Sequence, residues 1–136
     1  MSQDDVERLR KGYEDFNRGD FAAIFALLAD DFSVQDRAEV PDPQTYMGIA
    51  GARRAFEWVS NDFDDYSIEP FELVDGGDWV VVAALQRGRG KLSGAEVEGK
   101  IFHLWRLRDG LATELRGFST REEALAAAED PGWPSS

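Results

Sequence analysis

The chain has 136 residues, of which 43% are hydrophobic and 31% charged, and this composition is typical of one globular domain spanning residues 1–136. It has no cysteine, which excludes disulfides, thiolate nucleophiles and zinc sites with cysteine ligands. The formal net charge of −12 argues against nucleic-acid binding, because most of the surface would repel a phosphate backbone.

The sequence has no feature typical of a secretory signal, a membrane span or a histidine-rich metal site. Residues 1–10 are polar and acidic, unlike a secretory signal. The longest apolar run, Trp79 to Leu85, is too short to cross a bilayer. We therefore expect a cytoplasmic protein that does not contact membranes. A chain with a single histidine has no His-rich metal site, and we expect neither a metal nor a cofactor.

Helices are predicted in the first half of the chain. In the first of them, apolar residues recur three or four positions apart: Val6, Leu9, Tyr13 and Phe16. Gly19 suits the left-handed position after this helix, and Asp20 can cap a second helix that continues to Leu28. The short connection between the two helices predicts a helical hairpin.

The middle of the chain reads as a strand, a loop and a third helix. Residues 32–36 alternate as a short strand. Two prolines mark a loop that runs to about Tyr46, and the third helix follows, with Ala52, Phe56 and Val59 facing inward. Residues 61–65 are expected to form an acidic turn.

Strands are predicted from Tyr66 onward. Pro70 is expected at an edge or a bulge. The strands are residues 67–74, 79–86, 97–108 and 111–118, with hairpin turns at 75–78 and 109–110 and a flexible glycine-rich connection at 88–94. A capping box from Thr120 to Glu123 opens a last helix. Together these elements predict an α+β fold in which a curved antiparallel sheet, with helices on one face, encloses a pocket.

His103, the one histidine of the chain, lies on an apolar strand face. Side chains alternate across a strand, so His103 shares its face with Ile101 and Trp105. A lone imidazole among large apolar groups either has a hydrogen-bond partner in the protein, such as Asp36, Tyr13 or a backbone carbonyl, or lines a cavity and meets a ligand. Both alternatives remain open.

Several stretches fall in the order and at the spacing expected of one family. They are residues 27–34, 48–56, 75–82, 88–94, 103–110 and 121–125. The chain resembles the SnoaL-like proteins of the nuclear transport factor 2-like superfamily, which includes ketosteroid isomerase and polyketide cyclases, over nearly everything from Val6 to Ala128. The resemblance implies a cone-shaped, curved, mixed or antiparallel sheet wrapped around helices. It also implies a homodimer, commonly formed through the exposed face of the sheet.

The similarity to ketosteroid isomerase implies roles for two residues. Asp36 matches the position of the proton-abstracting aspartate, and it shares its strand face with Phe32 and Val34, where burial would make it a usable general base. Alternatively, Asp36 caps backbone amides or points to solvent. His103 matches a protonated aspartic acid that donates a hydrogen bond to the developing oxyanion. A histidine can donate as well, and can also act as an acid or base.

A third position departs from the isomerase. Its oxyanion tyrosine aligns with Gly12, and Tyr13 lies one position along, about 100° around the helix, which places it in the core or at the pocket rim. The residues expected to line the pocket are Tyr13, Trp58, Trp105 and Leu115. Trp105 would suit a flat aromatic ligand. Arg87 and Arg89 mark either a solvated hairpin end or a pocket mouth that faces an acidic ligand.

Two classes of function remain open for a ligand expected to be a small hydrophobic or aromatic molecule. The first is an acid/base isomerase, cyclase or dehydratase that acts on a hydrophobic carbonyl compound, with Asp36 and His103 as catalytic residues. The second is a non-catalytic ligand-binding or accessory protein. Epoxide hydrolysis, which in this superfamily uses an arginine with two aspartates, has no obvious matching trio in the sequence.

Overall fold

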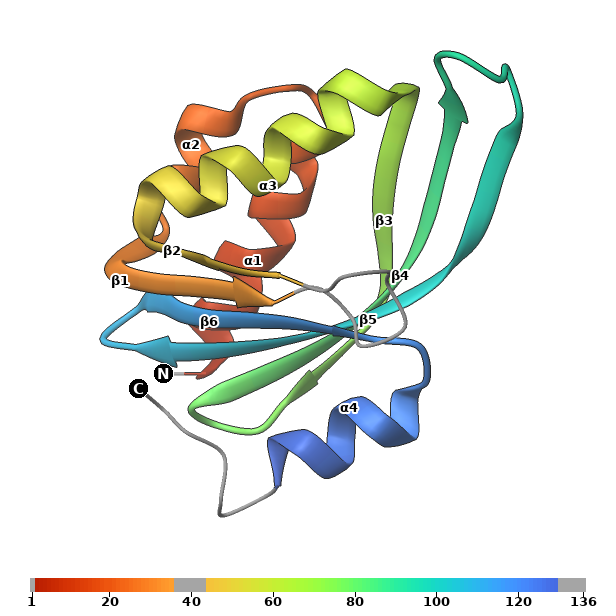
Figure 1. Cartoon of the computed structure of the whole chain (residues 1–136). Helices are drawn as coiled ribbons and strands as arrows, with labels where there is room; N and C mark the ends of the chain where they lie inside the picture. Colours follow the sequence, from red (N-terminus) through yellow and green to blue (C-terminus); the bar gives the residue numbers. More distant parts are fainter. Residues whose placement is uncertain (1, 36–43, 130–136) are drawn as a thin grey trace.

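The computed structural model describes residues 2–35 and 44–129, which form four helices and six strands (Figure 1). The helices are α1 (Ser2–Asn17), α2 (Phe21–Phe25), α3 (Gly48–Asp62) and α4 (Arg121–Ala128). The strands are β1 (Leu28–Gln35), β2 (Thr45–Met47), β3 (Phe63–Asp75), β4 (Trp79–Gly90), β5 (Glu96–Arg108) and β6 (Leu111–Phe118). The side chains of residues 2–3 and 58–60 lie outside this description. None of the described helices is long and apolar enough to span a bilayer.

The predicted helical hairpin is confirmed at its connection. Gly19 has a φ of +80°, the left-handed conformation that glycine adopts without a Cβ clash. Asp20 then caps α2, since its side chain accepts a hydrogen bond from the amide of Ala23 at 3.3 Å. These two local signals set the point where the chain reverses.

The predicted extension of the second helix to Leu28 is wrong. The helix ends at Phe25, and Leu28 is the first residue of β1. The carbonyl of Leu27 accepts a hydrogen bond from the amide of Ala112 at 2.8 Å, which draws this backbone towards β6. Pairing with a distant strand therefore overrides the local helical spacing.

The six strands form one open, mixed sheet in the order β2-β1-β6-β5-β4-β3. β1 runs parallel to β6, and the other neighbours are antiparallel. β2 lies where a loop was predicted, and it pairs with β1 through partners such as Val34 and Tyr46. A strand of three residues is too short to show an alternating pattern, so its partner and not its sequence defines it.

The β-hairpins follow their turn signals. Pro70 lies at a register shift of the edge strand β3, as predicted. Gly77 has a φ of +95° in the turn between β3 and β4. Asp109 and Gly110 have φ values of +53° and +81°, the two positive values that a tight two-residue hairpin turn requires.

Two predicted connections are wholly or partly regular structure. Residues 88–94 were expected to be flexible, but β4 continues to Gly90 and β5 begins at Glu96. Arg87 and Glu98 are cross-strand partners whose side chains form an ion pair at 2.8 Å, and such pairs extend the ladder. Residues 61–65, expected as an acidic turn, belong to the end of α3 and the start of β3.

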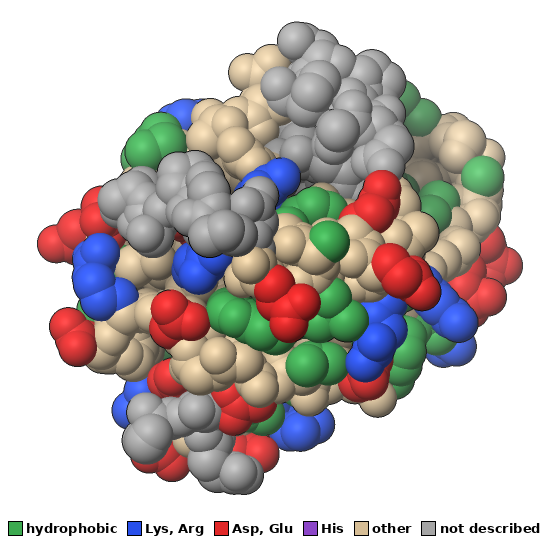
Figure 2. Space-filling view, turned by 90° about the horizontal axis from the view of Figure 1, so that it is seen from below, with side chains coloured by type: hydrophobic (Ala, Val, Ile, Leu, Met, Phe, Trp, Pro, Cys, Tyr) green, Lys and Arg blue, Asp and Glu red, His purple; other side chains and the backbone are tan. Residues whose placement is uncertain are grey.

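The sheet is apolar on both faces, and helices cover both of them. On the concave face, α1 and α3 pack against a core that includes Phe32, Val80, Val82 and Trp105. On the other face, α4 packs against Val81, Ala83, Phe102 and Leu104 (Figure 1). The prediction that helices lie on one face only is therefore wrong, because the second apolar face of β4 and β5 also needs cover. Seen from the α4 side, hydrophobic side chains lie between acidic and basic ones (Figure 2). The predicted fold class, α+β with a curved sheet, is confirmed.

Candidate functional site

A cavity of about 70 Å³ lies between the concave face of the sheet and the helices. Its walls come from α1, α2, α3 and strands β1, β3, β5 and β6. The side-chain polar atoms of this lining belong to three residues, Tyr13, His103 and Trp105. The surface of the cavity is almost entirely apolar, and the polar atoms of these three side chains bond to one another beside it. An apolar space of this kind suits a small apolar ligand.

Helix α1 supplies one wall. Leu9, Gly12, Tyr13 and Phe16 follow a spacing of three, one and three, so they share one side of the helix and all line the cavity. Gly12 has no side chain, and a Cβ there would come within 3.2 Å of Leu27. Its neighbour Tyr13, only 6% exposed, fills this side of the cavity with its ring.

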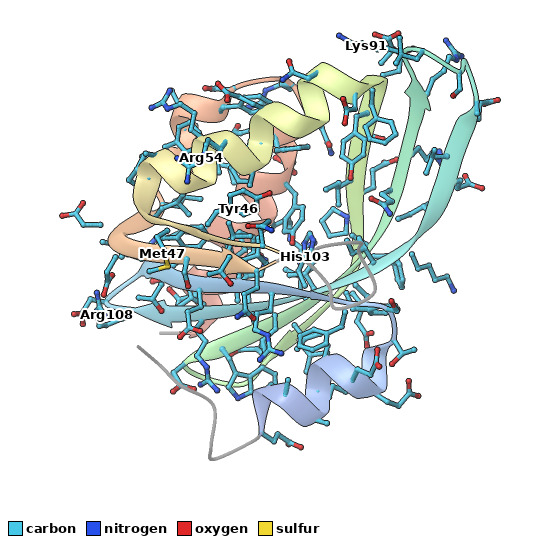
Figure 3. All side chains as sticks on the ribbon, in the orientation of Figure 1. Tyr46, Met47, Arg54, Lys91, His103 and Arg108 are labelled. Carbon is cyan, nitrogen blue, oxygen red and sulfur yellow. The ribbon has the colours of Figure 1, made fainter. Side chains whose placement is uncertain are left out.

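Three of the lining side chains, all aromatic, form a hydrogen-bonded chain. The indole Nε1 of Trp105 donates to the hydroxyl oxygen of Tyr13 at 2.9 Å. The same hydroxyl lies 2.7 Å from Nδ1 of His103. The rings of Tyr13 and His103 are stacked, and both meet Trp105 edge-on. Figure 3 shows His103 near the middle of the molecule.

Burial controls the protonation of Tyr13. Loss of contact with water raises the pKa of its hydroxyl far above the usual range, and the hydrogen bond from Trp105 offsets only part of this effect. Tyr13 therefore keeps its proton near neutral pH. The site contains a hydroxyl donor beside an imidazole.

The chain matches the sequence model of the SnoaL-like domain over residues 9–115. It belongs to the SnoaL-like family. The resemblance read from the sequence is thus confirmed. Comparison with curated proteins finds no match.

Solved structures with the same fold as this SnoaL-like protein include three informative examples. An NTF2-like protein of unknown function from Burkholderia pseudomallei is 22% identical, with a TM-score of 0.75 over 93% of this chain and 98% of that chain. A putative SnoaL-like polyketide cyclase from Jannaschia is 20% identical, with a TM-score of 0.78 over 96% and 95%. A protein with a ketosteroid isomerase-like fold from Catenulispora acidiphila, in complex with trimethylamine, is 17% identical, with a TM-score of 0.70 over 99% and 97%. At these identities the likeness shows the fold alone.

The structure brings four of the six predicted site residues of this SnoaL-like protein to one cavity. Tyr13, His103, Trp105 and Leu115 all line it. Asp36 and the side chain of Trp58 lie outside the described residues. Among the described residues, Tyr13 is a partner of His103, because its hydroxyl lies at hydrogen-bond distance from the ring.

Arg87 and Arg89 do not line this cavity. Arg87 pairs with Glu98 at 2.8 Å, and Arg89 with Asp65 at 3.7 Å, all on exposed side chains. They support the interpretation as a solvated hairpin end. Within residues 2–35 and 44–129, no group of three or more His, Asp or Glu side chains is placed to hold a metal ion.

Several lining residues were not singled out from the sequence. Phe16, Leu27 and Phe56 line the cavity, although the sequence suggested only that Phe16 and Phe56 face inward on their helices. Helical spacing identified the inward faces but could not show which inward residues border empty space. That depends on how closely the helices approach the sheet.

Proposed function

We propose that this SnoaL-like chain binds a small, largely apolar carbonyl compound in the cavity and catalyses its isomerisation, cyclisation or dehydration. The observation that carries the proposal is the hydrogen-bonded pair of Tyr13 and His103 in an otherwise apolar wall. Apolar walls favour an apolar ligand, and a few polar groups fix its orientation.

The volume of the cavity limits the size of the ligand. A dry cavity of about 150 Å³ holds a benzene molecule in an engineered protein, and the cavity here is about 70 Å³. The described walls alone thus enclose less space than benzene needs, and a five-membered cyclic ketone would fill this space and extend slightly beyond it. A polycyclic ligand stacked on Trp105 would have to extend beyond these walls, so we favour the smaller class.

In the proposed reaction, Asp36 is the base and His103 is the donor. The Asp36 carboxylate takes a proton from the carbon next to the carbonyl, and the C–H electron pair forms an enolate whose charge lies on oxygen. His103 stabilises that oxygen by a hydrogen bond. The Asp36 carboxylic acid then returns the proton to another carbon, which leaves the enzyme unchanged. The role of Asp36 rests on the family resemblance.

The isomerisation of 3-cyclopentenone to 2-cyclopentenone tests this proposal, because the conjugated product absorbs ultraviolet light. We expect turnover by the wild type and a fall in kcat/KM of about 10²- to 10⁴-fold in Asp36→Asn and in His103→Ala. Glu14→Gln, an exposed change on α1, is the control and should keep full activity. Equal rates in the wild type and both site variants would refute the catalytic assignment.

A non-catalytic ligand-binding protein of the same fold is the second candidate. One observation favours it: Gly12 stands where the isomerase has its tyrosine, and the nearby Tyr13 hydroxyl is already engaged by Trp105 and His103. This candidate predicts binding of the ketone without conversion. The same absorbance assay, combined with a binding titration, separates the two.

We also propose a homodimer through the sheet face opposite the cavity, on the basis of the family resemblance. α4 occupies part of that face, so the contact would use the part formed by β3 to β5. Phe71 supports this choice, because it is 56% exposed there and lies 5.8 Å from the ammonium of Lys100. An exposed aromatic ring beside a cation is suited to an interface.

A further inference from the structure

We propose that the carboxamide of Gln86 is a specificity-determining group just outside the cavity, where it donates a hydrogen bond to an acceptor oxygen of the ligand. The side chain lies on the concave face of β4, beyond the apolar walls. This role rests on the proposed function, because it needs a ligand in the cavity. It adds that the ligand carries a second, neutral acceptor oxygen at the end away from the reacting carbonyl.

Gln86 lies one step beyond the cavity wall. Its partner on β3 is Ile68, a buried residue that lines the cavity. Directly opposite residues of an antiparallel pair share a face, with their Cβ atoms about 4.5–5.5 Å apart. Ala84, two residues earlier on β4 and therefore on the same face, belongs to the core on the concave side. Gln86 thus borders the cavity on the side where the hairpin of β4 and β5 extends beyond α3 (Figure 1).

Two aromatic rings lie beside Gln86 because β3 contains a bulge. Phe63 and Tyr66 are three residues apart and would point to opposite faces of a regular strand. The register of β3 shifts between them, and Asp65 within this bulge has a φ of +53°. Both rings therefore lie on one face of β4, where a Cβ at Gly88 would come within 3.0 Å of Tyr66 and 3.4 Å of Phe63. The glycine leaves room for the Tyr66 ring.

The hydroxyl of Tyr66 orients the Gln86 amide. It donates a hydrogen bond to Oε1 of Gln86 at 2.7 Å, and its ring packs edge-on against Phe16 of the cavity wall, with the centroids 6.1 Å apart. The other end of the amide, Nε2, carries two N–H groups. Among the described residues, no side chain or backbone group accepts from them. The group that Gln86 offers to a ligand is therefore a donor, and its complement is an acceptor oxygen.

The concave face beside this amide is open as far as the described residues define it. Gly99 is the partner of Gln86 on β5, and a Cβ at Gly99 would meet no described atom within 4 Å. Val97, two residues away on the same face of β5, is 40% exposed. A ligand that fills the cavity as far as Ile68 therefore has room to continue towards Nε2 of Gln86.

The surroundings of Gln86 favour a neutral oxygen. Its neighbours on its own face of β4 and β5 are uncharged, namely Ala84, Gly88 and Gly99. Side chains alternate along both strands, so the charged residues of this stretch lie on the opposite face: Arg87, Glu98 and Lys100. A carboxylate beside Gln86 would lose water without gaining a cation, whereas a carbonyl oxygen loses less and gains the N–H donor.

Two cyclic ketones of equal size test this role. 4-Methylcyclohexanone and cyclohexane-1,4-dione differ in whether a methyl group or an oxygen stands opposite the first carbonyl, and both are large enough to extend beyond the described walls. Calorimetric titration gives the affinity of the dione relative to that of the methyl ketone. We expect this ratio to be about three- to tenfold lower in Gln86→Leu than in the wild type, because one hydrogen bond is lost.

Two further variants separate the amide from its support. Tyr66→Phe should lower the ratio by a smaller factor, since it keeps the amide and removes the hydroxyl that orients it. Glu69→Gln, an exposed change on the other face of β3, is the control and should leave the ratio unchanged.

The side-chain N–H signals of Gln86 give a second readout, which a purely structural role would not change. Their absence from NMR spectra of ¹⁵N-labelled Gln86→Leu and Gln86→Glu identifies them. The dione should shift them saturably and by more than the methyl ketone does. Equal shifts with both ketones, or the same affinity ratio in the wild type and Gln86→Leu, would overturn the role of Gln86 and leave the proposed function standing. Binding of neither ketone would refute binding in the cavity, and the role of Gln86 with it.

Discussion

The hydroxyl of Tyr13 stabilises the fold as well as shaping the site. A buried hydroxyl without partners is costly, and Tyr13 avoids this cost by bonding to both Trp105 and His103. Through these bonds the first helix is joined to the fifth strand. The residue that positions His103 is therefore also part of the core.

Asn17 makes a second polar connection, this time to an edge strand. Its side-chain amide donates to the carbonyl of Ile68 at 2.9 Å, and its oxygen accepts from the Ile68 amide at 2.8 Å. Ile68 lies on β3, an edge strand of the sheet. The Asn17 side chain therefore bonds to backbone groups that have no neighbouring strand on this side. Such cover protects an edge from pairing with other chains.

Replacing Asn17 by alanine should lower the free energy of unfolding by about 1–3 kcal/mol, because both backbone groups of Ile68 lose their partner. Chemical denaturation measures this change. Glu14→Ala, on an exposed turn of the same helix, should stay within about 0.5 kcal/mol of the wild type. A loss no larger than that of Glu14→Ala would show that water replaces the Asn17 amide at no cost.

At the scale of elements, local signals predicted the ends of segments and failed where distant pairing decides. The cap at Asp20 and the turn at Asp109 and Gly110 depend on a few adjacent residues, and both are found as expected. The early start of β1 and the presence of β2 depend on backbone partners far along the chain. No pattern within either segment could reveal them.

One ion pair connects two strands that are not neighbours. β6 lies between β1 and β5 in the sheet. Across it, the guanidinium of Arg108 at the end of β5 donates two hydrogen bonds, of 3.0 and 3.3 Å, to the carboxylate of Asp31 on β1. The Arg108 guanidinium lowers the pKa of Asp31 below its usual value, mainly through these hydrogen bonds. Both side chains are half exposed, so the effect on stability is small.

This pair predicts a specific pH dependence. The pKa of Asp31 is lower in the folded state than in the unfolded state. The contribution of its charge to the free energy of unfolding is therefore complete above the unfolded-state pKa of about 3.9, and it is lost as the pH falls through the folded-state pKa. Asp31→Asn should therefore have a slightly lower Tm than the wild type near pH 7 and the same Tm near pH 2. Asp64→Asn, a change at an exposed carboxylate of β3, is the control and should keep the Tm of the wild type. A Tm difference for Asp31→Asn that persists near pH 2 would mean that the charge of Asp31 is not its cause.

For the whole molecule, the site forms where a face of α1 contacts a face of β5, and the sequence predicted each face separately. The alternation at residues 101–107 placed His103 beside Trp105, and the helical spacing placed Tyr13 on an inward face. Their contact joins residues 90 and 92 positions apart in the chain. Which inward residues border the cavity depends on the distance between α1 and the sheet, and this is set by packing and not by a local pattern.

The proposed function requires this cavity to bind a small ketone, and a titration with cyclopentanone shows whether it does. In protein labelled with ¹⁵N-histidine, the NMR signals of the single histidine, His103, report contact with the ketone in the wild type. Leu115→Phe adds a ring to the cavity wall, and Leu111→Phe adds one to a partly exposed position of the same strand. With folding of each variant verified by its Tm, we predict saturable binding in the wild type and in Leu111→Phe, and a loss of about tenfold or more in Leu115→Phe. Equal affinity in all three proteins would refute binding in this cavity, because the ketone would then bind elsewhere.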